Sequence, residues 1–190
     1  MRTSLRRPLA VSAAVGTAAH NAFELGSGVG LVWQPELGLA GALALWGVQL
    51  PAWITLAARG ERRWDKAVAV LSGTALAGMI VHFTIGTWRR GPLGLPVLVA
   101  YQGLSDRQLS IYNAILAAWG LAAAGALAVE APQGTRRWGL VGLTTLPLLR
   151  RSASHHFAWA THQARDNPAW WNRSLKPRDA VGGLSHFQVA

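Results

Sequence analysis

The chain has 190 residues, of which 51% are hydrophobic and 14% are charged. Soluble proteins carry about 25% charged residues, so this composition is typical of a membrane protein. Cysteine is absent, which excludes a disulfide framework, thiol catalysis and metal sites built from thiolates. The net charge of +10 would favour nucleic acid as the partner of a soluble chain, but here the arginines flank apolar runs, as membrane topology requires. We therefore expect membrane lipids, and no nucleic acid, as partners.

Four apolar runs come within or near the length of roughly 17 to 25 residues that crosses a bilayer. They predict an all-α, polytopic helical membrane bundle with four transmembrane helices, over Pro8 to Trp33, Leu37 to Ala58, Ala67 to Trp88 and Ile111 to Val129. Basic residues precede the first run and separate the second from the third. This pattern predicts a cytoplasmic N-terminus in a bacterial-type plasma membrane. A cleavable signal peptide is the alternative for the first run, which nevertheless continues past Ala19 to Trp33.

A shorter fifth helix is predicted over Trp138 to Leu149, just before Arg150 and Arg151. At about 1.5 Å per residue it is too short to cross a hydrocarbon core of about 30 Å, and its depth in the membrane stays open. The stretch from Ser152 to Arg165 is amphipathic, and four residues after it are typical of interfacial anchors: Trp170, Trp171, Arg173 and Lys176. We expect residues 1–176 to form one membrane bundle and residues 177–190 to be a flexible tail.

The first apolar run is interrupted by polar residues at helical spacing. Thr17, His20, Glu24 and Ser27 follow one another at offsets of three, four and three, so on a helix they form one polar stripe. Ionisable groups are costly inside a membrane, and the stripe is expected to face other helices or a cavity. A histidine and a carboxylate one turn apart can exchange a proton. The alternative is a polar pair that only joins helices.

Further polar and aromatic residues of the other runs are candidates for the same pocket. His82 lies near the end of the third run, and Tyr112 and Asn113 begin the fourth, where the Asn113 amide can both donate and accept hydrogen bonds. Each of these residues has an alternative role in packing between helices. Three tryptophans lie deeper than an interfacial belt requires and are predicted to wall a substrate pocket: Trp46, Trp53 and Trp119.

A second group of histidines follows the fifth predicted helix. His155, His162 and Asp166 share one helical face, and His156 lies beside them in the sequence. Because His155 and His162 are two turns apart, about 10 Å, they cannot bind one metal ion without a bend. The sequence leaves metal binding at these histidines open, and we predict neither a metal nor a cofactor.

The run from Ala44 to Trp53, ALWGVQLPAW, followed by a basic turn, resembles the second helix of the emopamil-binding protein (sterol isomerase, EXPERA-like) family. His20 and Glu24 match that family's His-x-x-x-Glu pair, and Asn113 matches an asparagine of its fourth helix. The resemblance covers about residues 18–130. It implies a four-helix fold around an intramembrane cavity, where an acid protonates a double bond of a sterol-like substrate and a tryptophan steadies the carbocation.

These observations favour an intramembrane enzyme that transfers protons to and from an isoprenoid or sterol-like lipid, as an isomerase or a protonation-initiated cyclase. An Asp-rich motif for magnesium diphosphate is absent. In this hypothesis Glu24 is the proton donor, His20 is its partner and Asn113 is a polar contact. One alternative is a non-catalytic lipid-binding protein or accessory subunit of a membrane complex. A third is proton or ion translocation through His20, Glu24 and His82.

Overall fold

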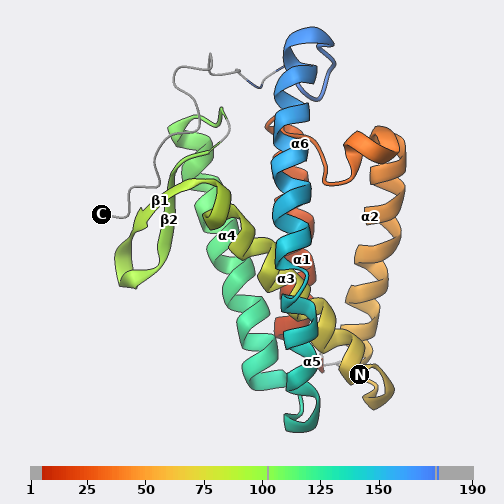
Figure 1. Ribbon diagram of the computed structural model, residues 1–190. Coiled ribbons are helices and arrows are strands. Elements are labelled where there is room, and N and C mark those ends of the chain that lie inside the picture. The colour runs from red at the N-terminus through yellow and green to blue at the C-terminus, as the bar shows by residue number, and fades with distance from the viewer. Residues whose placement is uncertain (1–5, 102, 174, 176–190) are drawn as a thin grey trace, which may run out of the picture.

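The fold is an all-α bundle with one short β-hairpin (Figure 1), seen in a computed structural model that describes residues 6–101, 103–173 and 175. Helices α1 to α3 precede the hairpin, and α4 to α6 follow it. In chain order the elements are α1 (Pro8–Gly26), α2 (Gln34–Arg59), a 3-10 turn (Arg62–Trp64), α3 (Asp65–Ile85), β1 (Thr87–Arg90), a 3-10 turn (Pro92–Gly94), β2 (Pro96–Ala100), α4 (Asp106–Gly125), a π-helical turn (Ala126–Glu130), α5 (Gln133–Leu143) and α6 (Leu146–Asp166). The helical class predicted from the sequence is confirmed.

Within the described residues, three helical segments are long and apolar enough to span a membrane: Gln34–Arg59, Arg62–Ile85 and Asp106–Glu130. They agree with a membrane protein, but the predicted set of four spans is not confirmed. The run that begins at Pro8 differs from the prediction because its helix ends at Gly26 rather than reaching Trp33. Gly28 and Gly30 have φ angles of 87° and 86°, which favour glycine and turn the chain out of the helix.

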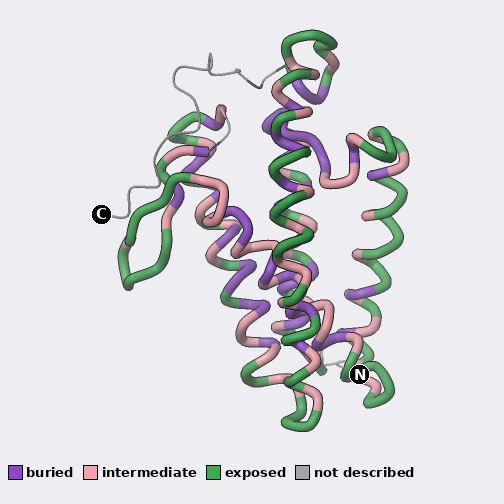
Figure 2. The backbone as a smooth tube through the Cα atoms, viewed as in Figure 1, coloured by how far each residue is buried: buried purple, intermediate pink, exposed green. Residues whose placement is uncertain are grey.

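Helix α1 is the inner helix of the bundle. It packs against α2, α3 and α4, and one of its faces is buried throughout, including Ala10, Ala13, Ala14 and the predicted polar residues Thr17, His20 and Glu24. By contrast, α2 stands at the edge and is largely exposed (Figure 2). Exposed apolar residues of α2, such as Leu43, Leu45 and Val48, are suited to lipid contact. The polar stripe therefore faces the protein interior, as predicted.

Both ends of α1 are fixed by contacts from outside the helix. At its start, the carboxylate of Glu130 accepts hydrogen bonds from the backbone N–H groups of Leu9 (2.6 Å) and Ala10 (2.9 Å). A negative charge at a helix N-terminus satisfies free N–H groups and complements the helix dipole. At its end, the backbone carbonyl of Glu24 accepts from the N–H groups of Val29 (2.9 Å) and Gly30 (3.2 Å). The Glu130 contact thus ties the start of α1 to the turn after α4, and the bonds to Glu24 close the helix at its other end.

The fifth predicted helix is two helices. A break at Thr144 and Thr145 separates α5 from α6, and Pro147 lies in the first turn of α6, where a missing N–H costs nothing. Helix α6 has 21 residues and includes the amphipathic stretch from Ser152 to Arg165, so the prediction of one short helix over Trp138 to Leu149 is wrong. Its inner face packs on the bundle through Ala153, His156, Phe157 and Ala160.

Two tryptophans that follow α6 differ in their burial. Trp171 is buried and stacks on Trp159, with ring centroids 5.5 Å apart and planes 8° apart, whereas Trp170 is 65% exposed. Trp171 therefore packs within the fold and is not an interfacial anchor. Lys176 and the predicted tail of residues 177–190 lie outside the described residues.

The hairpin is an element that the hydropathy pattern does not indicate. Strands β1 and β2 pair antiparallel, and the hairpin projects from the bundle beside α4 (Figure 1). It is joined to α4 by the side chain of Asn113, whose Oδ1 accepts from the Leu98 N–H (2.8 Å) and whose Nδ2 donates to the Leu98 carbonyl (2.9 Å). These two bonds satisfy the backbone N–H and C=O groups of Leu98. Leu98 is the buried residue of a strand whose other residues are exposed or partly exposed.

Glycines allow α3 and α5 to pack with their backbones in contact. A Cβ on Gly73 would meet the backbone carbonyl of Gly139, and a Cβ on Gly142 would meet the backbone of Val70 and Thr74. Small residues permit such close approach between helices in membranes. This contact holds α3, and with it His82, against the second half of the chain.

We expect Gly142→Ala to destabilise the bundle by about 1–3 kcal/mol, because the added methyl group forces α3 and α5 apart. Gly134→Ala is the matched control on α5, since a Cβ there meets nothing within 4 Å. Thermal unfolding of both variants in detergent measures the difference. Equal stability of the two variants would show that the α3–α5 contact is not close.

Candidate functional site

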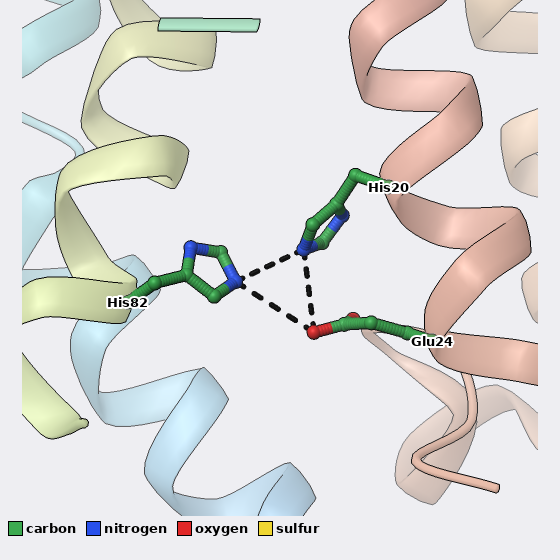
Figure 3. A group of neighbouring side chains, drawn as sticks. All are labelled: His20, Glu24 and His82. Atoms are coloured by element: carbon green, nitrogen blue, oxygen red, sulfur yellow. Dashed lines mark hydrogen bonds and ion pairs between the residues drawn. The ribbon is translucent and has the colours of Figure 1, made fainter. Parts of the chain in front are cut away.

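Three ionisable side chains from two helices meet inside the bundle (Figure 3). His20 and Glu24 lie one turn apart on α1, and His82 lies near the end of α3. The Nε2 atoms of His20 and His82 are 2.9 Å apart, and Glu24 Oε1 lies 3.2 Å from His20 Nε2 and 3.6 Å from His82 Nε2. We call these three residues the His–Glu–His cluster. Each is at most 5% exposed.

Tyr112 adds a hydroxyl from a third helix, α4. Its OH group donates a hydrogen bond of 2.6 Å to Glu24 Oε1 and lies 3.0 Å from His20 Nε2. The residue is fully buried, and its ring packs against Phe23 at 5.0 Å between centroids. Hydrogen bonds to a carboxylate are stronger than neutral ones, so Tyr112 helps to hold the buried charge of Glu24.

The far ring nitrogens of both histidines bond to carbonyl oxygens. His82 Nδ1 donates to the backbone carbonyl of Met79 (3.2 Å), and His20 Nδ1 lies 3.2 Å from the side-chain oxygen of Asn21. The Met79 carbonyl can only accept, so its bond places the ring proton of His82 on Nδ1, and the same proton position on His20 lets Asn21 Oδ1 accept from it. These contacts also orient each ring so that Nε2 points at Glu24.

Trp119 of α4 forms an aromatic wall beside the cluster. Its ring centroid lies 4.9 Å from that of His20, with a tilt of 35°. Two glycines make room for the indole, because a Cβ on Gly16 of α1 would come within 2.9 Å of Trp119 Cβ and one on Gly78 of α3 within 3.0 Å of its ring. An aromatic face at this distance can stabilise a neighbouring positive charge.

An apolar pocket of about 100 Å³ opens beside the cluster, which forms part of its wall. Most of its surface is apolar, and the exposed Gln49 at its edge shows that it reaches the outside of the bundle next to α2. Residues from α2, α3, α4 and α6 complete the wall, among them Trp46, Trp53, Leu71, Trp119, Ala153 and Phe157. Within this lining the cluster and a few hydrogen-bonding side chains are the polar surface, an arrangement typical of ligand sites.

The structure brings together most, but not all, of the residues singled out from the sequence. His20, Glu24, His82 and Tyr112 form one connected group, and Trp46, Trp53 and Trp119 line the pocket next to it. Asn113 does not join them, because both ends of its amide bond the backbone of Leu98. Its expected contact with substrate or with Glu24 therefore has no geometric support.

Sequence reasoning missed two contributors. Tyr101, in the loop before α4, packs against Tyr112 at 5.5 Å between ring centroids, and Phe157 of α6 lines the pocket. The spacing of Phe157 with Ala153 and Ala160 on the amphipathic stretch was the available signal for an inward-facing residue. Tyr101 follows a hairpin and carries no comparable periodic signal.

The histidines of α6 are not gathered into a site. His155 is exposed, with its Nε2 3.8 Å from Glu36, whereas His156 is buried. His162 is exposed and bonds Asp166 at 3.0 Å. Among the described residues, the group of three metal-ligating side chains within reach of one another is the His–Glu–His cluster.

No protein-family model, curated protein or solved structure matches this chain. The resemblance to the emopamil-binding protein family therefore stays a prediction. The function has to be argued from the cluster and the pocket themselves.

We expect Tyr112→Phe to destabilise the fold by about 1.5–3 kcal/mol, because it removes a buried hydrogen bond to a carboxylate. Tyr101→Phe is the control: it deletes a buried hydroxyl that has no hydrogen-bond partner among the described residues. Unfolding in detergent measures both variants. A Tyr112→Phe variant as stable as Tyr101→Phe would contradict the bond between Tyr112 and Glu24.

Proposed function

We propose that this protein is an intramembrane enzyme that transfers protons to and from a hydrophobic, isoprenoid-like lipid, as an isomerase or a protonation-initiated cyclase. The observation that carries the proposal is the fully buried His–Glu–His cluster in the wall of an apolar pocket that opens toward the lipid-facing helix α2. Ionisable groups at such depth are costly, and they mark functional sites in membrane proteins. A role limited to joining helices would not require a pocket beside them.

The cluster and Tyr112 form a path along which a proton can move. Tyr112 OH contacts both Glu24 and His20, and His20 in turn contacts His82, with successive atoms 2.6 to 3.0 Å apart. These distances are within the range for general acid–base catalysis. In the proposed reaction Glu24, supported by His20, delivers a proton to a double bond in the pocket. The indole of Trp119 then faces the positive charge that develops.

The pocket size favours the end of a linear isoprenoid over a whole sterol. A cavity of roughly 150 Å³ holds a benzene molecule, and the pocket here encloses about 100 Å³. One isoprene-sized group fits such a space, whereas a rigid four-ring sterol requires several times more. The rest of a linear chain would leave the pocket beside Gln49 and lie in the membrane.

Proton transfer to carbon can be detected even when the product is unidentified, because it introduces deuterium from the solvent. The protein in lipid nanodiscs is incubated in deuterium oxide with squalene, polyprenols and one sterol as separate substrates, and each lipid is analysed by mass spectrometry. We expect deuterium in a linear isoprenoid with the wild type and loss of at least about 100-fold of this activity in Glu24→Gln. Glu36→Gln, which alters an exposed carboxylate on α2, should keep full activity.

A Glu24→Gln variant with full activity would remove Glu24 from the mechanism. If neither protein incorporates deuterium into any substrate, the lipids that co-purify with the wild type identify its role. A single bound isoprenoid without turnover would replace the enzyme by a lipid-binding protein. Bulk phospholipid with a stable partner protein would favour an accessory subunit.

The topology that we propose places the N-terminus in the cytoplasm and the end of α6 on the opposite side of the membrane. The start of α1 lies at the same end of the bundle as the α2–α3 and α4–α5 turns, whereas the α1–α2 loop and the end of α6 lie at the opposite end (Figure 1). Helices α5 and α6 together lead the chain from the α4–α5 turn back to the opposite end of the bundle (Figure 1). The basic residues before α1 and between α2 and α3 favour the cytoplasm for their end.

Single cysteines test this topology, since the chain has none of its own. In intact cells, an impermeant maleimide should label exposed positions 36, 93 and 170, introduced as Glu36→Cys, Leu93→Cys and Trp170→Cys. Arg63→Cys and Gln133→Cys should react only after the cells are opened. Labelling of position 63 in intact cells would reverse the orientation, and protection of position 170 would show that the end of α6 does not lie on the opposite side.

A further inference from the structure

The His–Glu–His cluster has the shape of a metal site. Two ligand atoms bonded to one ion at about 2.1 Å, with bond angles of about 90° to 109°, lie about 3.0 to 3.4 Å apart. The three distances among His20 Nε2, His82 Nε2 and Glu24 Oε1 are 2.9, 3.2 and 3.6 Å. One ion can therefore contact all three atoms with little movement of the side chains. Two imidazoles and one carboxylate also form the donor set of catalytic zinc and of non-haem iron(II) sites.

The contacts of the two rings leave both Nε2 atoms available to a cation at this point. When Nδ1 carries the ring proton, as the contacts with the Met79 and Asn21 oxygens favour, Nε2 of a neutral ring is unprotonated. Two nitrogen lone pairs and a carboxylate oxygen then face one another in a buried, apolar surrounding, where like partial charges repel strongly. A single proton can join two of these atoms but not all three. A divalent ion bonds to all three and offsets the charge of Glu24.

The contacts around the cluster are those that support metal ligands elsewhere. Histidine ligands usually donate their second ring N–H to a carbonyl or carboxylate, and ligating carboxylates accept further hydrogen bonds. Here Met79 and Asn21 accept from His82 and His20, and Tyr112 donates to Glu24. The cluster also borders the pocket, so an ion bound there would keep a coordination position open toward a ligand.

We propose that His20, Glu24 and His82 bind one divalent first-row transition-metal ion of the zinc or iron(II) class. Imidazole ligands disfavour Mg²⁺ and Ca²⁺, which prefer oxygen donors. This site goes beyond the proposed reaction and does not depend on it. With an ion bound, Glu24 would be a ligand, and a water molecule polarised by the ion would take its place as the proton donor of the proposed chemistry.

Metal content tests the site without any activity measurement. The protein is produced with an affinity tag that contains no histidine, in medium supplemented with zinc, iron and manganese, and is analysed by inductively coupled plasma mass spectrometry. We expect about one equivalent of a single transition metal per chain in the wild type. His82→Asn and Glu24→Gln should reduce it by at least about 10-fold. The double variant His155→Gln/His162→Gln, which alters exposed histidines of α6, should keep the full amount.

If the cluster variants do not fold, measurements on the wild type alone test the metal site. After removal of metal with a chelator, Co²⁺ is added, and binding at two imidazoles and a carboxylate should produce visible ligand-field bands at one equivalent. The melting temperature of the chelated protein should rise when Zn²⁺ or Co²⁺ is restored. A wild type without stoichiometric metal, cobalt bands or a thermal shift would overturn the metal site. Metal that is lost from the His155/His162 variant instead would place the ion on α6.

Discussion

The fold depends on keeping one carboxylate, that of Glu24, deep inside an apolar bundle. An isolated ionised carboxylate in such a place would cost many kcal/mol, so its partners are part of the structure. They come from three helices: His20 from α1, His82 from α3 and Tyr112 from α4. The Tyr112 hydroxyl donates to the carboxylate directly, and in the proposed metal site the ion held by His20, His82 and Glu24 offsets its charge, so the groups that stabilise Glu24 also join these three helices.

The remainder of the bundle holds this arrangement in place. Glu130 ties the start of α1 to the turn that follows α4, and the N–H groups of Val29 and Gly30 close the other end of α1 by bonding the carbonyl of Glu24. Close packing of α3 on α5 through Gly73 and Gly142 fixes the helix that carries His82. Helix α2 contributes Trp46 and Trp53 to the pocket but remains largely exposed. This contrast separates the buried His–Glu–His cluster from an exposed edge of the bundle at α2.

Local features of the site could be predicted from the sequence, and contacts between distant segments could not. The i, i+4 spacing of His20 and Glu24 on an apolar helix can be read from a few neighbouring residues. The same residues predict that the polar stripe faces inward. The pairing of Glu24 with His82 joins residues 58 positions apart in the sequence, and no local period encodes it. Asn113 is the converse case, a residue that the sequence placed in the site and the structure does not. As a polar residue beside Tyr112 it resembled a site residue, yet it serves the backbone of Leu98 in a hairpin that hydropathy does not detect.

The central claim is that Nε2 of both His20 and His82 is unprotonated and directs its lone pair at the point between the two rings and Glu24. Both the proposed metal site and the compensation of the Glu24 charge follow from it. Solid-state ¹⁵N NMR of histidine-labelled protein in lipid measures it directly, with His20→Gln and His82→Gln spectra to assign the signals. We predict a protonated Nδ1 and an unprotonated Nε2 for both His20 and His82. A proton on Nε2 of either ring would contradict the account, since the two nitrogens would then be joined by a hydrogen bond and would no longer converge on a cation.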